Sequence, residues 1–462
     1  MPPVRTVIPL DPPARVLLYV PTLNESGFKQ RHVDGEALAL YAHLKATGQD
    51  CVLLDAYYRG RPAPDLATVL AEGASFDAVA VHLWTSDAYG PRLRRIADEL
   101  AAARLTYGVP VIGFGPLATS AQHELRDHGA LDYTVGLSPA SVPASLDTPV
   151  ARLIGDMGTR LTRHTPLTRL SASDVPYLPD AVVSVSASRG CRSRCTFCAY
   201  NADLGGGWHE LSIAAAVADL AHLHRLTGAT RFAFADTDFG GTPDACHRRA
   251  RALRDALAAQ GLIGTVTLAI NIRSETLTPD TVTVLAEAGV RTMLLGVESF
   301  NDATLRRLYG KRQDLDHLHR IVRAADACGV TTVASYILWH PWQTIDSLRV
   351  ELASIDAFGR HRIPQFMARS RLLVIPGTVI EQRIRQADLL DAAPFHRRFR
   401  FADPAAAELH DALVHRFETT TAPVLARLSE ERHGDLTTLA SLKIDEWQWL
   451  ANAAGLGASP LI

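Results

Sequence analysis

Three of the six cysteines in this chain lie within eight positions, in the stretch SRGCRSRCTFCAYN at residues 188–201. Cys191, Cys195 and Cys198 have the spacing C-x3-C-x2-C. The apolar run before them (181–188) predicts a strand, and Gly190 predicts the start of a loop. Thiols gathered in one loop of an intracellular chain bind metal or do chemistry more often than they fill a core.

Several kinds of cysteine chemistry compete for this loop. A structural zinc ion takes four ligands, and no second C-x2-C pair or nearby histidine pair supplies a fourth. A disulfide would leave one thiol over, and reactive-cysteine catalysis needs one thiol with a base rather than three. Three unrelated core cysteines are the remaining alternative. Compact cysteine runs are typical of iron–sulfur ligation, and three thiolates on a four-iron cluster would leave one iron open to a ligand.

The first third of the chain alternates apolar runs of strand length with helical patterns. Strands that are apolar throughout predict a parallel sheet that is buried on both faces and binds ligands at the carboxyl ends of its strands. The residues expected at those ends are Thr85, Ser86, Gly113 and Gly115. No G-x-G-x-x-G follows the first strand, so a nicotinamide site has no support. The strands expected here are 15–20, 51–57, 76–84 and 109–115, the helices are 34–48 and 91–108, and 123–136 is expected to be a helix that leads into a short fifth strand.

Length and composition limit the classes of protein to consider. A chain of 462 residues suggests about three domains. The net charge of −2 gives no electrostatic case for binding nucleic acid or an anionic membrane. We find no signal-peptide pattern and no run of about 18 apolar residues, and six cysteines are too few for a disulfide framework. We therefore expect a cytoplasmic protein without nucleic-acid or membrane partners.

The cysteine spacing, with Phe197 just before the last cysteine, resembles the radical S-adenosylmethionine (radical SAM) superfamily. Four later stretches resemble successive strands of its barrel, and 110–136 resembles the closing half of the cobalamin-binding domain of many members. The resemblance implies an α/β fold: an N-terminal Rossmann-like cobalamin-binding-type domain, then a partial (β/α)6 barrel, then a small, mostly helical C-terminal region. The four stretches are 231–242, 267–311, 329–348 and 372–390, and the expected boundaries are 1–140, a linker at 141–180, 181–390 and 391–462.

In that superfamily, three cysteines hold a 4Fe–4S cluster whose open iron chelates SAM, and one electron splits SAM to give a 5′-deoxyadenosyl radical. The resemblance makes Glu298 and Arg273 binders of SAM. A solvated strand end and a structural ion pair are the alternatives for these two residues. Asp236 and Asp238 would position a cofactor or substrate, or cap the next helix. Phe197 completes the residues expected to contact SAM.

Two residues are candidates for catalysis. Tyr200, followed by Asn201, comes directly after the last cysteine and could contact adenine or substrate. His340 lies between Trp339 and Trp342, where it would line the mouth of the barrel and could exchange a proton near neutral pH. A packed aromatic cluster is the alternative for this stretch.

Cobalamin domains that ligate cobalt through histidine carry D-x-H-x-x-G after their first strand. Here QRHVDG (30–35) keeps His32 and Gly35 but has Gln30 in place of the aspartate. We therefore expect any cobalamin to bind with its own base detached and with no histidine on cobalt. Cys51, Cys246 and Cys328 have apolar or helical neighbours and are expected to be core thiols, so a second cluster is not expected.

These features predict a cobalamin-dependent radical SAM enzyme that methylates an unactivated carbon of a small molecule or peptide. Two alternatives stay open: a ring contraction, cyclisation or rearrangement with cobalamin redox-active or absent, and a non-catalytic cobalamin or cluster sensor. The expected partners are the substrate and an external one-electron donor such as flavodoxin or ferredoxin.

Overall fold

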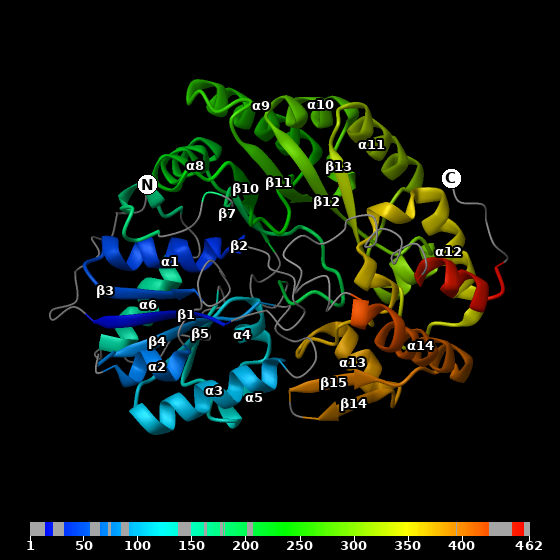
Figure 1. Ribbon diagram of the computed structural model, residues 1–462, viewed down its shortest axis with the longest axis horizontal. Helices are drawn as coiled ribbons and strands as arrows, with labels where there is room; N and C mark the ends of the chain where they lie inside the picture. The colour runs from blue at the N-terminus through cyan, green and yellow to red at the C-terminus, as the bar shows by residue number, and fades with distance from the viewer. Residues whose placement is uncertain are drawn as a thin grey trace.

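The computed structural model describes residues 14–21, 32–55, 65–72, 75–84, 92–136, 149–160, 164–175, 179, 181–200, 207–393, 395–424 and 446–456. Two parallel sheets dominate it, one in the N-terminal part and one in the middle of the chain (Figure 1). The C-terminal part lies below the second sheet in this view and beside the first (Figure 1). The fold is α/β, as the sequence predicts.

The N-terminal sheet has five parallel strands in the order β3-β1-β4-β5-β6. Its central strands are buried along almost their whole length because helices cover both faces. The strands are β1 (Arg15–Val20), β3 (Asp50–Asp55), β4 (Ala78–His82), β5 (Val111–Phe114) and β6 (Tyr133–Val135). The helices of this part are α1 (Gly35–Ala46), α2 (Leu66–Ala71), α3 (Arg92–Tyr107), α4 (Pro116–Ser120), α5 (Gln122–Asp127) and α6 (Pro149–Arg160).

The second sheet has six strands in the order β13-β12-β11-β10-β7-β2. A helix lies between each pair of successive strands of this sheet from β7 to β13 and packs on the outer face, and these four helices form the upper arc of Figure 1. The strands are β2 (His32–Val33), β7 (Val182–Val185), β10 (Arg231–Phe234), β11 (Thr267–Ile272), β12 (Val290–Glu298) and β13 (Thr331–Tyr336). The helices are α8 (Ile213–Thr227), α9 (Pro243–Ala259), α10 (Pro279–Glu287), α11 (Leu315–Ala327) and α12 (Ile345–Phe358).

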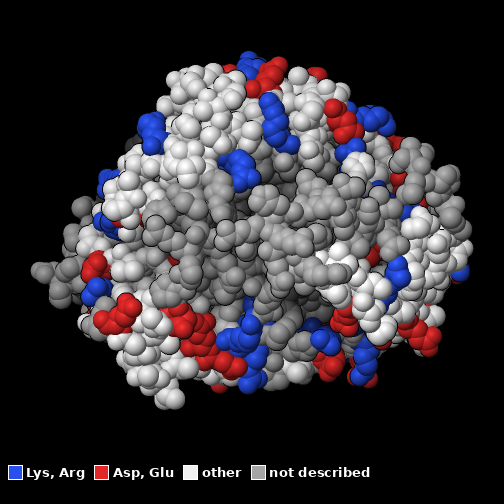
Figure 2. Space-filling model, in the orientation of Figure 1, with Lys and Arg blue, Asp and Glu red and all other residues white. Residues whose placement is uncertain are grey.

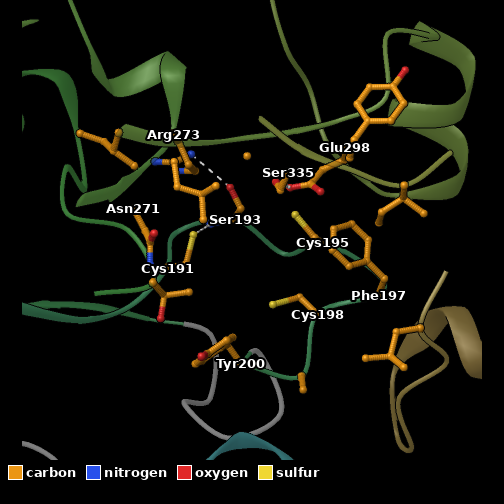
Figure 3. Close-up of a pocket in the computed structure, with 18 of the residues that line it drawn as sticks. Cys191, Ser193, Cys195, Phe197, Cys198, Tyr200, Asn271, Arg273, Glu298 and Ser335 are labelled. Carbon is orange, nitrogen blue, oxygen red and sulfur yellow. Dashed lines mark hydrogen bonds between the residues drawn. The ribbon is translucent and has the colours of Figure 1, made fainter. Parts of the chain in front are cut away.

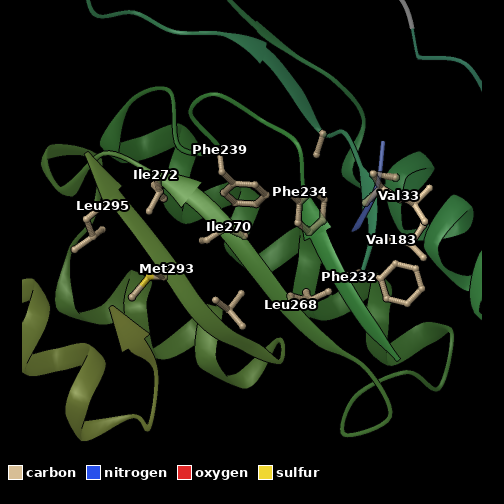
Figure 4. Close-up of a cluster of buried hydrophobic side chains, with 14 of the residues drawn as sticks. Val33, Val183, Phe232, Phe234, Phe239, Leu268, Ile270, Ile272, Met293 and Leu295 are labelled. Atoms are coloured by element: carbon tan, nitrogen blue, oxygen red, sulfur yellow. The ribbon is translucent and has the colours of Figure 1, made fainter. Parts of the chain in front are cut away.

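Local sequence explains why these helices begin where they do. Each follows a Ser, Thr or Asp whose side chain accepts a hydrogen bond from a backbone N–H of the first turn. Buried and half-buried residues alternate along β11, β12 and β13. The buried set packs under the helices (Figure 4), and the half-buried set faces the inside of the barrel. The capping residues are Ser212, Thr242, Thr278, Asp314 and Thr344.

The two sheets are joined through β2, which precedes α1 in the chain but pairs with β7 of the barrel. Val33 lies beside Val183 in the pairing register and in Figure 4. The next residue but one, Gly35, has room only for hydrogen: a Cβ there would stand 2.7 Å from the Ser184 Cβ. The start of α1 is therefore pressed against the first barrel strand, and the two domains share one core.

The C-terminal part contains a hairpin that the sequence analysis does not predict. β14 (Leu390–Ala393) and β15 (His396–Phe399) pair in antiparallel fashion before α14 (Pro404–Arg416). Phe395, in the turn, packs into the core of the N-terminal sheet, and its N–H bonds the Glu124 carboxylate. The stretch 446–453 is helical, as expected, and buries Trp447 while Trp449 packs against the same core.

The remaining short elements lie near the barrel. The stretch 372–390, expected to end the barrel, directly follows one parallel bridge, Trp339–Arg371, and contains the helix α13 (Val379–Gln386). β8 (Ser188–Gly190) and β9 (Trp208–Glu210) form a two-stranded ribbon beside the cysteine loop, and a one-turn π-helix, η5 (Thr304–Leu308), follows β12.

Acidic and basic side chains are interspersed around the rim of the face in Figure 2, as the small net charge leads one to expect. Among the described helices, none is both long and apolar enough to cross a membrane.

Candidate active site

The three cysteines lie in the loop that follows β8. Each is half-buried, and their sulfur atoms point into one open space (Figure 3). The backbone N–H of Ser193 donates to the Cys191 sulfur over 3.4 Å, and the Cys198 N–H donates to the Cys195 carbonyl over 3.2 Å. These bonds hold the loop in a tight turn that brings residues seven apart in sequence to one point.

The open space belongs to a cavity of about 610 Å³ at the carboxyl ends of the barrel strands. The inward-facing residues at the ends of β11, β12 and β13 line it, as do Trp84, just after β4 of the N-terminal sheet, and residues of the stretch 366–375. Both domains therefore contribute to its wall. Its volume lies within the usual range for small-molecule sites, about 300–1,000 Å³.

Glu298 ends β12 and lines the cavity beside the cysteines. Its backbone has φ = +70°, a left-handed conformation that costs energy for a residue with a Cβ and tends to occur at functional sites. Its carboxylate accepts from the Ser335 hydroxyl over 3.1 Å and lies 3.6 Å from the Lys311 ammonium. A Cβ on Gly296 would stand 3.0–3.1 Å from both charged groups, so glycine makes room for this pair.

The sequence analysis missed Lys311. It is 5% exposed, lines the cavity and donates to the Gly296 carbonyl. A buried lysine is costly without partners, and here the carboxylate of Glu298 and a carbonyl supply them. The sequence signal was weak, because Lys311 follows η5 in a stretch with several other basic residues.

Arg273, after β11, holds the cysteine loop from the inside. Its guanidinium donates to the Ser193 hydroxyl over 3.1 Å (Figure 3), to Asp238 over 2.8 Å and to the Gly241 carbonyl over 2.9 Å. Asp238 is fully buried and does not line the cavity. The ion pair that was an alternative for Arg273 thus exists, while the guanidinium still borders the cavity.

Asp236, at the end of β10, has one satisfied and one unsatisfied carboxylate oxygen. Oδ1 accepts from the backbone N–H groups of Ala187 and Ser188, so the residue does not cap a helix. Oδ2 has no hydrogen-bond partner, although the residue is 1% exposed and lines the cavity. Burial raises the pKa of this carboxyl to about 6. A buried acceptor without a partner marks a place where a ligand can donate a hydrogen bond.

Comparison with known families explains this arrangement. Residues 185–350, which hold the cysteine loop and the barrel up to α12, match the family profile of the Radical SAM superfamily. The chain contains a radical SAM domain. The matched region includes Asp236, Arg273, Glu298 and Lys311.

Solved structures extend the likeness of fold beyond the radical SAM domain. A structure of the cobalamin-dependent S-adenosylmethionine radical enzyme OxsB, with aqua-cobalamin and SAM bound, matches with a TM-score of 0.68 at 13% identity, over 96% of this chain and 72% of the other. The radical SAM methyltransferase TsrM from Kitasatospora setae, with tryptophan and a SAM analogue bound, matches with a TM-score of 0.57 at 17% identity, over 75% and 71%. No curated protein matches this chain in sequence. A fold like that of the N-terminal domain and barrel together thus occurs in the cobalamin-dependent enzyme OxsB.

The donor set of the radical SAM domain fits an iron–sulfur cluster. Within the described residues, no three histidine, cysteine, aspartate or glutamate side chains are arranged to hold a single metal ion. Burial raises the pKa of the Cys195 thiol to about 12, so a metal-free thiol there stays protonated and is a poor nucleophile. Three thiols around an open space are suited to a group larger than one ion, which would deprotonate them on binding.

Two further predicted residues lie at the cavity. Phe197 and Tyr200 both line it (Figure 3). Phe197 also packs edge-to-face on Tyr309, which anchors the cysteine loop through its backbone carbonyl. Asn201 lies outside the described residues.

The aromatic stretch after β13, which was predicted to line the mouth of the barrel, is not part of the cavity wall. Trp339, His340 and Trp342 are not among the residues that line the cavity. Trp339 is fully buried, and Trp342 packs in a second cluster below the barrel. Burial lowers the pKa of His340 to about 4, so its ring is neutral at pH 7, and the ring is 4% exposed and packs edge-on against Tyr309. The packed aromatic cluster is the arrangement found.

The predicted cobalamin contacts have a different outcome. Thr85 and Ser86 lie outside the described residues, as does the side chain of His32. Gly113 and Gly115 were expected to let a ligand approach the backbone. Each glycine is packed against a neighbouring side chain, because a Cβ at Gly113 would stand 2.7 Å from Leu131, and one at Gly115 would stand 2.6 Å from the His82 ring. A corrin contact with their backbone stays a prediction.

Proposed function

We propose that this protein is a radical SAM enzyme that uses a 4Fe–4S cluster, SAM and cobalamin to methylate an unactivated carbon of a small-molecule or peptide substrate of the secondary-metabolite kind. One observation carries the proposal: three cysteine sulfurs open into a cavity whose wall also includes Trp84 of the Rossmann-like domain. A cluster and a corrin bound to their respective domains would both border this space. The reducing cytoplasm, where free thiols and such clusters persist, is the compartment we propose.

The proposed roles of the side chains follow from their charges and contacts. Cys191, Cys195 and Cys198 would ligate three irons of the cluster. When bound and reduced by one electron, such a cluster splits SAM and supplies a radical that removes a hydrogen atom from the substrate. Glu298 would accept hydrogen bonds from the amino or ribose groups of SAM, and Lys311 would pair with its carboxylate.

The other polar side chains at the cavity would position the cysteine loop, SAM or the substrate. Arg273 keeps the cysteine loop in place through Ser193. The free Oδ2 of Asp236 would accept a hydrogen bond from SAM or the substrate. Few charged groups at the cavity are left without partners, which favours a substrate that is mainly apolar near its reacting carbon.

The position of His82 supports cobalamin binding without a histidine on cobalt. This residue ends β4, at the carboxyl edge of the N-terminal sheet. His82 is 1% exposed, lies 2.5 Å from the Asp34 carboxylate through Nδ1 and stacks on Phe114. It packs against Gly115 on the other side. His82 does not line the cavity and its Nε2 edge lies against Gly115, so the ring does not present a nitrogen to the space proposed for the corrin.

The test is anaerobic reconstitution with iron, sulfide and hydroxocobalamin, followed by product analysis with SAM and a reductant. Methyl transfer predicts that 5′-deoxyadenosine and S-adenosylhomocysteine form together, whereas 5′-deoxyadenosine alone would favour a rearrangement. Cys198→Ala should abolish cluster binding and 5′-deoxyadenosine formation with little change in the melting temperature. Cys328→Ser, which alters a half-buried thiol outside the cavity, is the matched control. A Cys198→Ala protein that kept its cluster would contradict the assignment.

A further inference from the structure

Five exposed arginines surround the cysteine loop on its outer side. Two of them, Arg192 and Arg194, lie between the first two cysteines, on either side of Ser193. The Ser193 side chain faces inward to Arg273. The loop therefore has an inner face with sulfurs and a hydroxyl, and an outer face with two guanidinium groups. The five arginines, called here the arginine surface, are Arg192, Arg194, Arg307, Arg312 and Arg383.

Contacts of neighbouring residues bring the segments that carry the other three arginines to this loop. Gly310, two residues before Arg312, lies against Thr196, since a Cβ there would stand 3.3 Å from the Thr196 side chain. Thr196 donates to the Tyr309 carbonyl over 3.0 Å and to the Leu308 carbonyl over 2.6 Å, which joins the loop to the segment after η5. The Ile380 N–H of α13 donates to the Thr196 carbonyl over 3.0 Å. Arg383 bonds the Arg307 carbonyl over 2.8 Å. Three segments far apart in sequence thus form one surface around the cysteines.

Nearby carboxylates offset the charge of this surface only in part: Glu275 and Asp314 line a surface pocket together with Arg312. Among the described residues, no carboxylate forms an ion pair with any of the five arginines. The neighbouring Arg306 and Arg385 do have such partners, Asp302 and Glu381. Five unpaired guanidinium groups make a region of positive potential on a chain whose net charge is −2. Such a region attracts an acidic partner and steers its approach.

We propose that the arginine surface docks an acidic one-electron carrier protein of the flavodoxin or ferredoxin class. The inference rests on the proposed function, because a cluster that splits SAM needs an electron from outside. In the step proposed, one electron leaves the carrier, which is oxidised by one electron, and the cluster is reduced by one. No bond forms or breaks in that step. Arg192 and Arg194 lie in the cysteine loop itself, between Cys191 and Cys195, so a carrier docked on them would lie next to half-buried residues that ligate the cluster.

The test compares a protein reductant with a small one. The variant Arg307→Glu/Arg312→Glu changes two exposed side chains that neither ligate the cluster nor line the cavity. The matched control is Arg251→Glu/Arg323→Glu, on α9 and α11 of the outer helical layer. We expect cluster reduction by flavodoxin hydroquinone at low ionic strength to slow by about ten- to a hundredfold in the first variant. Reduction by dithionite should be unchanged in both variants.

A second readout does not depend on turnover. The affinity of the cluster-loaded protein for oxidised flavodoxin, measured by titration calorimetry, should fall in Arg307→Glu/Arg312→Glu and, for the unaltered protein, with rising salt. An unchanged rate and affinity in that variant would overturn the docking surface. So would an equal loss with dithionite, which would mean that these arginines support the cluster itself. If the unaltered protein made no 5′-deoxyadenosine with dithionite, the proposed function would fail instead.

Discussion

The two parallel sheets of this protein have similar strands but different carboxyl edges. In the N-terminal sheet, the described residues at that edge contact one another: Asp34 bonds His82 and Trp84, and His82 packs on Gly115. In the barrel, the strand ends carry polar groups such as Asp236 and Glu298 that face a cavity. A parallel sheet offers the same edge in both cases, so what lies over the edge decides whether it becomes a site.

The two edges also differ in the free energy of ionising their buried carboxylates. Burial raises the pKa of Asp34, but attraction to His82 and hydrogen bonds from His82, Ala37 and Trp84 outweigh it, so the pKa lies below its usual value. Asp236 has fewer partners, and its pKa is raised. One carboxylate therefore stabilises the fold when ionised, and the other is costly to ionise. A costly group that faces a cavity indicates that ligand binding, rather than stability, accounts for it.

The strongest test of this contrast is Asp34→Ala. The substitution removes the N-cap of α1 and leaves the buried His82 ring and the Trp84 N–H without their acceptor. We expect a loss of about 3–5 kcal/mol in the free energy of unfolding, measured with denaturant. Asp34→Asn, which keeps an acceptor oxygen, should lose less. A loss below about 1 kcal/mol would contradict a stabilising role for this edge.

Asp236→Asn tests the barrel edge through pH. Because the folded-state pKa of about 6 lies above the ordinary 3.8, the folded protein binds this proton more tightly, and stability falls as pH rises through this interval. Well above pH 6, where the Asp236 carboxyl is ionised in both the folded and the unfolded protein, this loss of stability is constant. Asparagine does not ionise, so the variant should gain about 2–3 kcal/mol relative to the unaltered protein between pH 4 and pH 8. Melting temperatures across that range provide the measurement, and a gain independent of pH would argue against the raised pKa.

Trp84→Phe has the smallest expected effect. It changes a residue that bonds Asp34 at the edge of the N-terminal sheet and also lines the cavity of the barrel. It removes one hydrogen bond to Asp34, 2.8 Å long, while keeping an aromatic ring on the cavity wall. We expect a loss of about 1–2 kcal/mol in stability and weaker binding of hydroxocobalamin in a spectroscopic titration. Trp449→Phe, which alters a ring packed against the core far along the chain, serves as the control. An unchanged affinity for hydroxocobalamin would mean that Trp84 does not contact the bound corrin.

Much of the site could be predicted from short stretches of sequence. The cysteine spacing indicated a cluster because three ligands in one loop are close in space whatever the rest of the chain does. Glu298 and Arg273 were identifiable because each follows an apolar strand, and strand ends of a parallel sheet meet at one edge. Lys311 could not be identified in this way, since it reaches the cavity only because Gly296 leaves room for its side chain.

Three features depended on contacts between distant segments. Gly113 and Gly115 had the local pattern of a ligand-binding turn, and the structure packs each against a neighbouring side chain, Leu131 or His82. His340 could have faced the cavity, yet the chain turns it into the core. The hairpin of β14 and β15 has a mixed pattern, and it is held partly by Glu124, some 270 residues earlier in the chain.

The sequence by itself determined the strands, the helix starts and the ligand trio, because each depends on residues within a few positions of one another. Only the tertiary structure decided which strand ends face a cavity, which are covered by the protein's own side chains, and where exposed arginines gather around the cysteines. Those outcomes depend on packing between segments that lie from tens to hundreds of residues apart, for which neighbouring letters in the sequence carry no signal.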